Sequence, residues 1–318
     1  MDNGMKSKTA FVFPGQGSQY VGMGKAFLDI LPRARDVFEA GEAVTGLPLK
    51  ALCIEGPMDE LTKTVNLQSC LTAVEITCAA AAMESGLAPE AAAGHSLGEY
   101  PALWAAGALE LDDVFRLVQA RGRIMDETGA KRPGAMAAII GLKKEELDGL
   151  ILPLALRGII ATANHNSPEQ IVVTGEVRLV DALVKLVKEK GARAVPLKVA
   201  GAYHSPLMKE AADKFGKILE QIKFSTPKIP LYSNVTAKPE RDPETIKALM
   251  ARQMCEPVRW YEIVANMAGD GMSDFVELGP KNVLSNLIKK CLPKDTPRTF
   301  QVDTPEGLSE CEKAMGIT

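Results

Sequence analysis

The sequence has few cysteines, few histidines, no surplus of basic residues and no long apolar run, and each absence excludes a class of protein. Its six cysteines are scattered over 318 residues without a Cys-x-x-Cys pair, which excludes a disulfide scaffold and favours small buried apolar side chains. The three histidines, His95, His165 and His204, lack metal-ligand spacing, so no metal is expected. A formal net charge of −3 offers no surface for a phosphate backbone, so nucleic acid is not an expected partner.

Segments that cross or enter membranes are also missing. No apolar run reaches the roughly 18–20 residues needed to span a bilayer, so no membrane partner is expected. The polar first residues lack a secretory pattern, which favours a cytoplasmic protein. With 46% hydrophobic and 24% charged residues, the composition is that of a globular protein with about two domains.

The order of apolar runs predicts an α/β fold with an inserted unit. Residues 133–200 follow the order β-α-β-β-α-β, the split βαβ pattern of a ferredoxin-like subdomain, and residues 1–132 and 201–318 form the larger α/β domain. The tail after Pro293 is weakly patterned. In the larger domain we expect strands at 9–13, 91–93, 229–233 and 273–278, and helices from near Val21 and at 71–83, 99–106, 112–127, 205–221, 243–253, after 257 and up to 291.

A Gly-x-Ser-x-Gly segment, residues 94–98, lies between a small-residue strand and an Ala-rich helix. This is the context of a nucleophile elbow, a turn so sharp that side chains two positions from its centre would collide. Gly94 and Gly98 avoid that collision and expose the Ser96 hydroxyl. The pattern indicates a serine nucleophile, against a plain tight turn.

A serine needs a base, and three histidines allow elimination. His95 is adjacent to Ser96, and since neighbouring positions of a turn point in different directions, a packing role is favoured. His165 is expected on the surface of a hairpin. His204 lies in a loop between a strand and a helix, the usual place of catalytic groups, and is favoured as the general base. No acid can be assigned to orient it, but a backbone carbonyl can serve.

Two further features stay open on the residues alone. Arg121 lies in mid-helix, where most arginines are solvated, yet its guanidinium would suit an acyl group with a free carboxylate. The loop at residues 15–19 has two glycines but Tyr20 where a dinucleotide fingerprint needs a third. It is either a tight turn or a means of bringing a backbone N–H to a reacting oxygen.

Nine segments occur together in the order of one known family. With them the chain resembles, from about residue 9 to 291, the malonyl-CoA:acyl carrier protein transacylases, the acyltransferases of fatty acid synthesis. The segments are FVFPGQGSQ (11–19), GHSLGEY (94–100), QARGRIM (119–125), GAMAAIIG (134–141), NHNSP (164–168), YHS (203–205), SNV (233–235), RQ (252–253) and ELGP (277–280).

The resemblance implies a fold and a reaction. The fold is an α/β-hydrolase-like domain carrying the ferredoxin-like (βαββαβ) subdomain. The reaction is a ping-pong transfer of malonyl from malonyl-CoA to the phosphopantetheine thiol of acyl carrier protein, through a malonyl-serine. No cofactor is implied beyond the coenzyme A thioester substrate, and a monomer is expected.

It also implies residue roles. Ser96 would be the acylated nucleophile, His204 its base, and Arg121 the group that holds the malonyl carboxylate. The backbone N–H groups of Gln16 and Leu97 would form the oxyanion hole, and the main-chain carbonyl of Gln253 would orient His204.

The chain departs from the family at two places. Gln68-Ser69 stands where the family often has Gln-Pro, which leaves the start of that helix open. Tyr203 precedes His204, as an aromatic does in malonyl-selective members, leaving little room for an α-methyl branch.

Other functions share parts of this pattern. A serine thioesterase or hydrolase would have the same Ser96 and His204, a polyketide-pathway acyltransferase would use the same chemistry, and a catalytically silent module would only bind the carrier protein. Carrier proteins are acidic, so docking on a mildly acidic chain needs a local basic patch. The candidates, each also explained as a solvated face, are Lys188, Lys190 and Arg193, or Lys289 and Lys290.

Overall fold

The computed structural model describes residues 7–199, 201–294 and 296–317. Residues 1–6, 200 and 318, where ends of the expected domains fall, lie outside the described residues.

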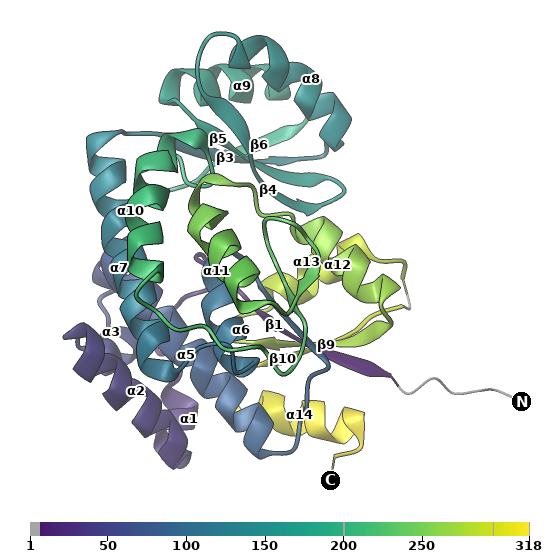
Figure 1. The fold of residues 1–318 in the computed structure, drawn as a ribbon. Helices are drawn as coiled ribbons and strands as arrows, with labels where there is room; N and C mark the ends of the chain where they lie inside the picture. The colour runs from purple at the N-terminus through teal and green to yellow at the C-terminus, as the bar shows by residue number, and fades with distance from the viewer. Residues whose placement is uncertain (1–6, 200, 295, 318) are drawn as a thin grey trace, which may run out of the picture.

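A six-stranded sheet forms the centre of the larger domain (Figure 1). Its order is β10-β9-β1-β2-β7-β8, and neighbouring strands are parallel except β7 and β8. The strands are β1 (Lys8–Phe13), β2 (Ala91–Gly94), β7 (Leu231–Tyr232), β8 (Pro239–Glu240), β9 (Met272–Leu278) and β10 (Arg298–Val302).

Helices cover both faces of this sheet, and β1 shows why. Its side chains alternate between two apolar clusters: Phe11 and Phe13 pack into one, Ala10 and Val12 into the other. A strand buried on both faces reads as one continuous apolar run, which is the pattern of residues 9–13. The helices of the larger domain are α1 (Lys25–Ile30), α2 (Pro32–Thr45), α3 (Leu49–Ile54), α4 (Met58–Thr62), α5 (Thr64–Glu84), α6 (Glu99–Ala105), α7 (Leu111–Lys131), α10 (Lys209–Leu219), α11 (Pro243–Arg252), α12 (Trp260–Gly269), α13 (Val283–Cys291) and α14 (Pro305–Met315).

Helix α5 is the central core helix. It begins at Thr64, seven residues before the expected start, and runs unbroken through Gln68 and Ser69. By length and composition it is apolar enough to span a membrane, so the expectation of no such run was wrong for this helix. In the structure, 89% of its most apolar 18-residue stretch is buried in protein, as in the core helix of a globular domain.

The inserted unit has the predicted order. Its four strands form an antiparallel sheet in the order β4-β5-β3-β6, and α8 and α9 cover one face with a separate apolar cluster. The α/β fold class with a small antiparallel subdomain is therefore confirmed. The elements are β3 (Ala135–Ile140), α8 (Lys144–Ala155), β4 (Ile160–Ser167), β5 (Gln170–Gly175), α9 (Val177–Glu189) and β6 (Arg193–Pro196).

The other face of this small sheet packs on the larger domain (Figure 1). Met136, Ala163 and Val172 belong to the same apolar cluster as Phe11 and Phe13. At the end of β4, the backbone of His165 donates to Val258 O (2.9 Å), and Val258 N–H donates to Ala163 O (2.8 Å). The two units thus share both apolar and backbone contacts at one seam.

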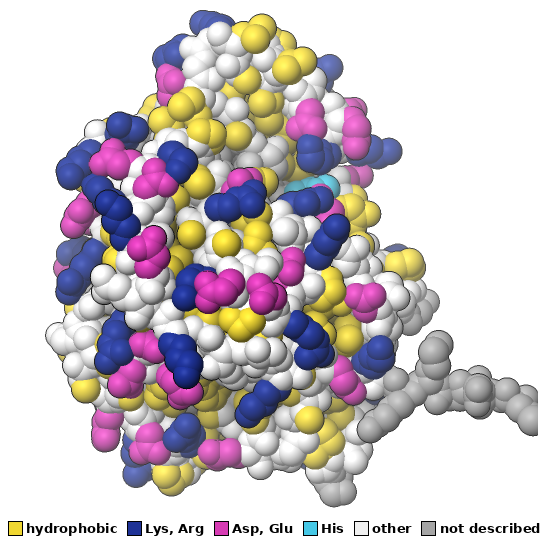
Figure 2. Space-filling model, in the orientation of Figure 1, with side chains coloured by type: hydrophobic (Ala, Val, Ile, Leu, Met, Phe, Trp, Pro, Cys, Tyr) yellow, Lys and Arg dark blue, Asp and Glu magenta, His cyan; other side chains and the backbone are white. Residues whose placement is uncertain are grey.

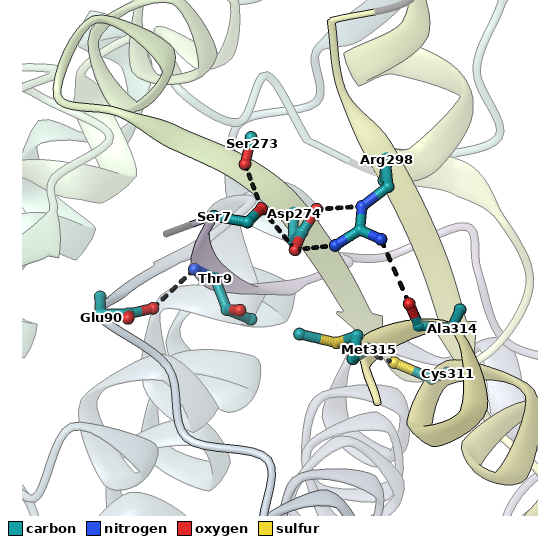
Figure 3. Close-up of polar contacts among 9 residues, drawn as sticks. All are labelled: Ser7, Thr9, Glu90, Ser273, Asp274, Arg298, Cys311, Ala314 and Met315. Atoms are coloured by element: carbon teal, nitrogen blue, oxygen red, sulfur yellow. Dashed lines mark hydrogen bonds and ion pairs between the residues drawn. The ribbon is translucent and has the colours of Figure 1, made fainter. Parts of the chain in front are cut away.

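The tail holds structure that its weak pattern does not predict. Strand β10 extends the main sheet, and α14 follows it. Figure 3 shows what holds them: buried Asp274 of β9 accepts from Arg298 Nε (2.6 Å) and Nη2 (2.5 Å). Arg298 Nη1 also donates to Ala314 O (3.2 Å), which ties α14 to the same edge.

Candidate active site

The elbow follows β2 directly. Ser96 has φ 54°, in the left-handed region that L-residues rarely occupy, and a short 3₁₀ turn (Ser96–Gly98) leads into α6. A Cβ on Gly94 would lie 1.8 Å from the carbonyl carbon of Gly98, and one on Gly98 would lie 2.1 Å from Phe13 O. Backbone atoms cannot move aside, so both positions require glycine for Ser96 to hold this turn.

Ser96 and His204 meet across the cleft. Ser96 Oγ lies 2.8 Å from His204 Nε2, and His204 Nδ1 lies 2.9 Å from Gln253 O and 3.1 Å from Glu256 O. Two carbonyls can only accept, so the ring proton sits on Nδ1 and leaves Nε2 free to take the serine proton. Burial, then the neighbouring charge of Arg121, lowers the pKa of His204 from 6.5 to about 3, which keeps the imidazole neutral.

Arg121 comes from α7 and is only 1% exposed, so it is not a solvated helix residue. Its Nη2 donates to Ser96 Oγ and to Gln253 Oε1, each at 3.0 Å, and its Nη1 donates to Gln68 Oε1 at 3.0 Å. The guanidinium carbon lies 5.7 Å from the centre of the Tyr100 ring. Gly122 allows this depth, because a Cβ there would lie 2.9 Å from Thr64 O of α5.

The guanidinium has neutral partners only. No Asp or Glu among the described residues forms an ion pair with Arg121, and its Nε has no hydrogen-bond partner there. Buried charges in proteins are normally paired. A buried cation that touches the Ser96 hydroxyl and carries no carboxylate of its own is suited to an anionic group on the substrate.

These side chains line a cleft of about 110 Å³ between the two units. Gln16 and Leu97, the expected oxyanion residues, are part of its wall. The larger domain also contributes His95, Ser96, Arg121, Met125, Tyr203 and His204, and the subdomain contributes Met136, Asn164, Leu197 and Val199.

Neither of the other two histidines bonds to the Ser96 hydroxyl, although His95 is part of the cleft wall. His95 Nε2 lies 2.8 Å from Asn166 Oδ1, and its ring lies 5.8 Å from Trp260, so it contacts the subdomain seam and not the serine hydroxyl. His165 was expected on a hairpin surface, and that expectation was wrong. It is 8% exposed, packs edge-on against Tyr261 and lies 3.6 Å from Glu262 Oε1, because β4 is covered by α12.

Three amide side chains belong to the site without having been predicted in these roles. They are Gln68 and the side chain of Gln253, which hold Arg121, and Asn234, whose Oδ1 accepts from Ser96 N–H (2.7 Å). Asn234 and Gln253 stand in the segments 233–235 and 252–253, whose co-occurrence with the elbow was the available signal. An amide's role depends on which backbone group faces it, and the sequence does not contain that information.

Charge is mixed over the surface. On the face shown in Figure 2, basic and acidic side chains are interspersed, with no large field of one sign. The two candidate basic patches are both exposed, one at the end of α9 and the start of β6, the other in the last turn of α13. Among the residues described, no three His, Cys, Asp or Glu side chains gather as metal ligands.

Comparisons with known proteins identify the family of the chain. Residues 10–304 match the family model described as an acyl transferase domain. The chain is 40% identical over 304 residues to the malonyl CoA-acyl carrier protein transacylase of Bacillus subtilis, covering 95% of each chain.

Solved structures of high similarity also exist. The malonyl CoA-acyl carrier protein transacylase of Coxiella burnetii superimposes with a TM-score of 0.94 at 33% identity, covering 98% of each chain. A malonyl-transacylase solved in complex with its type II polyketide acyl carrier protein gives 0.93 at 38% identity, covering 97% of this chain and 100% of that one.

Proposed function

Since the chain belongs to the acyl transferase family, as a malonyl-CoA:acyl carrier protein transacylase, we propose that Ser96, His204 and Arg121 carry the transfer. The enzyme moves the malonyl group from malonyl-CoA to acyl carrier protein and so supplies malonyl units for fatty acid synthesis. The observation that carries the residue assignment is the 3.0 Å contact between the Arg121 guanidinium and the same hydroxyl that lies 2.8 Å from His204.

In the first half-reaction, His204 Nε2 takes the Ser96 proton as Oγ attacks the thioester carbonyl of malonyl-CoA. The oxyanion faces the backbone N–H groups of Gln16 and Leu97, and each such donor lowers the barrier by roughly 3–4 kcal/mol. The C–S bond then breaks, the imidazolium returns its proton to the departing thiolate, and malonyl-Ser96 with free coenzyme A results.

In the second half-reaction, the pantetheine thiol of acyl carrier protein gives its proton to His204 and attacks the malonyl ester. The tetrahedral intermediate collapses, Ser96 Oγ leaves with the proton from His204, and malonyl is bound to the carrier. A thioester is exchanged for a thioester, so the reaction is close to balanced. The main-chain carbonyls of Gln253 and Glu256 keep the His204 proton on Nδ1 throughout.

Arg121 gives the site its preference for malonyl. The substrate carboxylate forms a charge-assisted pair with the guanidinium, which fixes the acyl group against the serine and favours a thiol acceptor over water. Tyr203, 5% exposed in the cleft wall, leaves little room for an α-methyl branch.

Finer properties are proposed on the same basis. One chain contains every residue of the site, which supports a monomer, and all six cysteines are free thiols, as a reducing cytoplasm allows. The carrier docks on Lys188, Lys190 and Arg193 or on Lys289 and Lys290. A polyketide carrier would use the same chemistry, so we expect transfer to a fatty acid carrier to be faster than to a polyketide carrier when the two are compared as acceptors.

Intact-mass measurement after mixing with malonyl-CoA tests the proposal. Wild-type protein is expected to gain one malonyl group, located on Ser96 by peptide mapping, and to lose it when acyl carrier protein is added. Ser96→Ala is the matched control and gains none. If wild-type protein gains no adduct, the chain is a module that only binds the carrier protein. If malonyl-Ser96 is hydrolysed by water as fast as it is transferred to the carrier, the protein is a hydrolase.

A further inference from the structure

Glu99, the first residue of α6, is buried behind the elbow, and the mechanism above does not use it. Its carboxylate accepts two hydrogen bonds from donors on different segments. Oε1 accepts from the backbone N–H of Asn234 (2.7 Å), and Oε2 accepts from Nε2 of Gln253. A carboxylate can accept at both oxygens, whereas an amide can accept at only one.

The first donor, Asn234, spans the elbow with its side chain. Its Oδ1 accepts from Ser96 N–H (2.7 Å) and its Nδ2 donates to Gly94 O (2.6 Å). The amide thus bonds to the backbone on both sides of the strained turn, in the manner of a neighbouring strand. Glu99 fixes the backbone from which this amide extends.

The second donor, Gln253, links Glu99 to Arg121. Its Nε2 donates to Glu99 and to Ser96 O (2.7 Å), which turns its Oε1 toward Arg121 Nη2 at 3.0 Å. With the amide reversed, an NH₂ group would face the guanidinium and a carbonyl would face Ser96 O. Because an ionised carboxylate can only accept, Glu99 in that form selects the orientation of the Gln253 amide that holds Arg121.

The charge of Glu99 also suits this place. Burial raises its pKa to about 7, while the bonds from Asn234 and Gln253 and the charge of Arg121 oppose that rise. Above that pH, Glu99 is a negative charge near Arg121 that reaches the guanidinium only through the Gln253 amide. A carboxylate in direct contact would occupy the position that the substrate needs.

We propose that Glu99 is a positioning residue that orients the Asn234 and Gln253 amides, and so sets Ser96 and Arg121 in place for the malonyl carboxylate. This inference rests on the function proposed above for Ser96 and Arg121.

The test compares kcat/KM for malonyl-CoA and acetyl-CoA in Glu99→Gln, with active sites counted by the mass of the acylated protein. Gln has nearly the same shape but must turn an NH₂ group toward one of the two donors. We expect the preference for malonyl over acetyl to fall at least about tenfold. Glu99→Asp keeps two accepting oxygens and is expected to retain the preference to within about threefold.

Glu277→Gln is the matched control. Glu277 is also buried, with its pKa raised to about 7 by burial, and it accepts from the backbone N–H groups of Leu284 and Ser285, away from Arg121. Its substitution is expected to lower stability and to leave the malonyl preference unchanged.

A Glu99→Gln protein that loses stability but keeps the wild-type preference would overturn the proposal, because a merely structural role moves only the former. Should this variant not fold, Glu99→Gln/Gln253→Glu returns a matched acceptor and donor between the two positions. That protein places a carboxylate directly on Arg121 and is expected to lose its malonyl preference; wild-type preference there would equally contradict us. Wild-type enzyme that gains no malonyl on Ser96 would overturn the proposed function itself, independently of the Glu99 variants.

Discussion

Arg121 is placed to hold the substrate through charge, and its removal should change which acyl group is used. Arg121→Met keeps an apolar stem of similar length and removes both guanidinium donors. Two charge-assisted hydrogen bonds at about 1.5–3 kcal/mol each predict a loss of about 10²–10⁴-fold in kcat/KM for malonyl-CoA, with acetyl-CoA used as well as or better than before. Steady-state rates with both donors measure this.

The control for that variant lies on the same helix. Arg116→Met removes an exposed arginine that pairs with Asp113, and both rates are expected to stay at their wild-type values. An Arg121→Met enzyme with unaltered malonyl preference would show that the guanidinium does not bind the carboxylate.

His204 predicts a pH dependence of stability. Its pKa falls from 6.5 to about 3 on folding, so between these values the unfolded chain binds a proton that the folded protein does not. Stability from this residue is therefore present above pH 6.5 and is lost as the pH falls. Lowering the pH from 6.5 to 5 should cost wild-type protein about 2 kcal/mol more than His204→Gln, measured by urea unfolding.

Three buried carboxyls act in the opposite direction. Burial raises the pKa values of Glu99 and Glu277 to about 7 and raises the pKa of Glu75 well above its ordinary value. All three bind protons in the folded state first, so they stabilise the fold as the pH falls. These carboxyls are present in both wild type and His204→Gln, so their contributions cancel. The difference in pH dependence of the unfolding free energy between the two proteins therefore reports on the histidine alone. Equal pH slopes would contradict a lowered pKa.

For single residues, the sequence predicted those whose chemical role follows from residue type and spacing alone. Ser96 between two glycines and His204 in a loop are such cases. Gln68 and Asn234 were not predicted in their contacts, because an amide is assigned only when its donors and acceptors are placed. His165 was misplaced because the covering helix α12 lies about 100 residues further along the chain.

Among the elements, the strand–turn–helix elbow is the least tolerant of substitution. Gly94→Ala would bring a methyl group within 1.8 Å of backbone, and we expect a loss of about 3 kcal/mol or more in the free energy of unfolding. Gly149→Ala is the matched control, since this helical glycine has nothing within 4 Å of its Cβ position. It should gain about 0.5–1 kcal/mol. Urea unfolding of the two proteins gives opposite signs if the elbow requires glycine.

Two of the elements that sequence patterns missed bury little surface of their own. Strand β10 lies at the sheet edge with only Val302 buried, and α14 buries only Cys311. Such segments lack the periodic apolar signal and depend on single contacts such as Asp274 with Arg298. The subdomain has its own apolar cluster under two amphipathic helices, which is why its order was predictable.

For the whole molecule, the domain boundaries remain a prediction. Strands β3 and β6 pair antiparallel, so the two ends of the unit at residues 133–200 leave the larger domain side by side. We expect this segment, expressed alone, to unfold cooperatively in urea with a stability of only about 2–4 kcal/mol. Its stability is limited because Met136, Ala163 and Val172, which pack on the larger domain in the intact chain, would be exposed to water.

Circular dichroism of the isolated unit decides the point. A gradual, non-cooperative urea curve would mean that the boundaries mark a change of pattern and not an autonomous fold. Replacing the three seam residues with serine is the companion variant, expected to keep the transition and reduce self-association.

The cleft between the two units is lined by residues of both, and they divide the work: one unit transfers protons and the other limits which acyl group fits. The proton-transfer groups stand on the larger domain, whereas Met136, Leu197 and Val199 on the inserted unit border the space for the acyl chain. Substitutions in the insert can therefore widen or narrow the range of acyl donors while the Ser96–His204 distance stays unchanged. An enzyme divided in this way allows new building blocks to be selected by redesigning one small unit and leaving its chemistry intact.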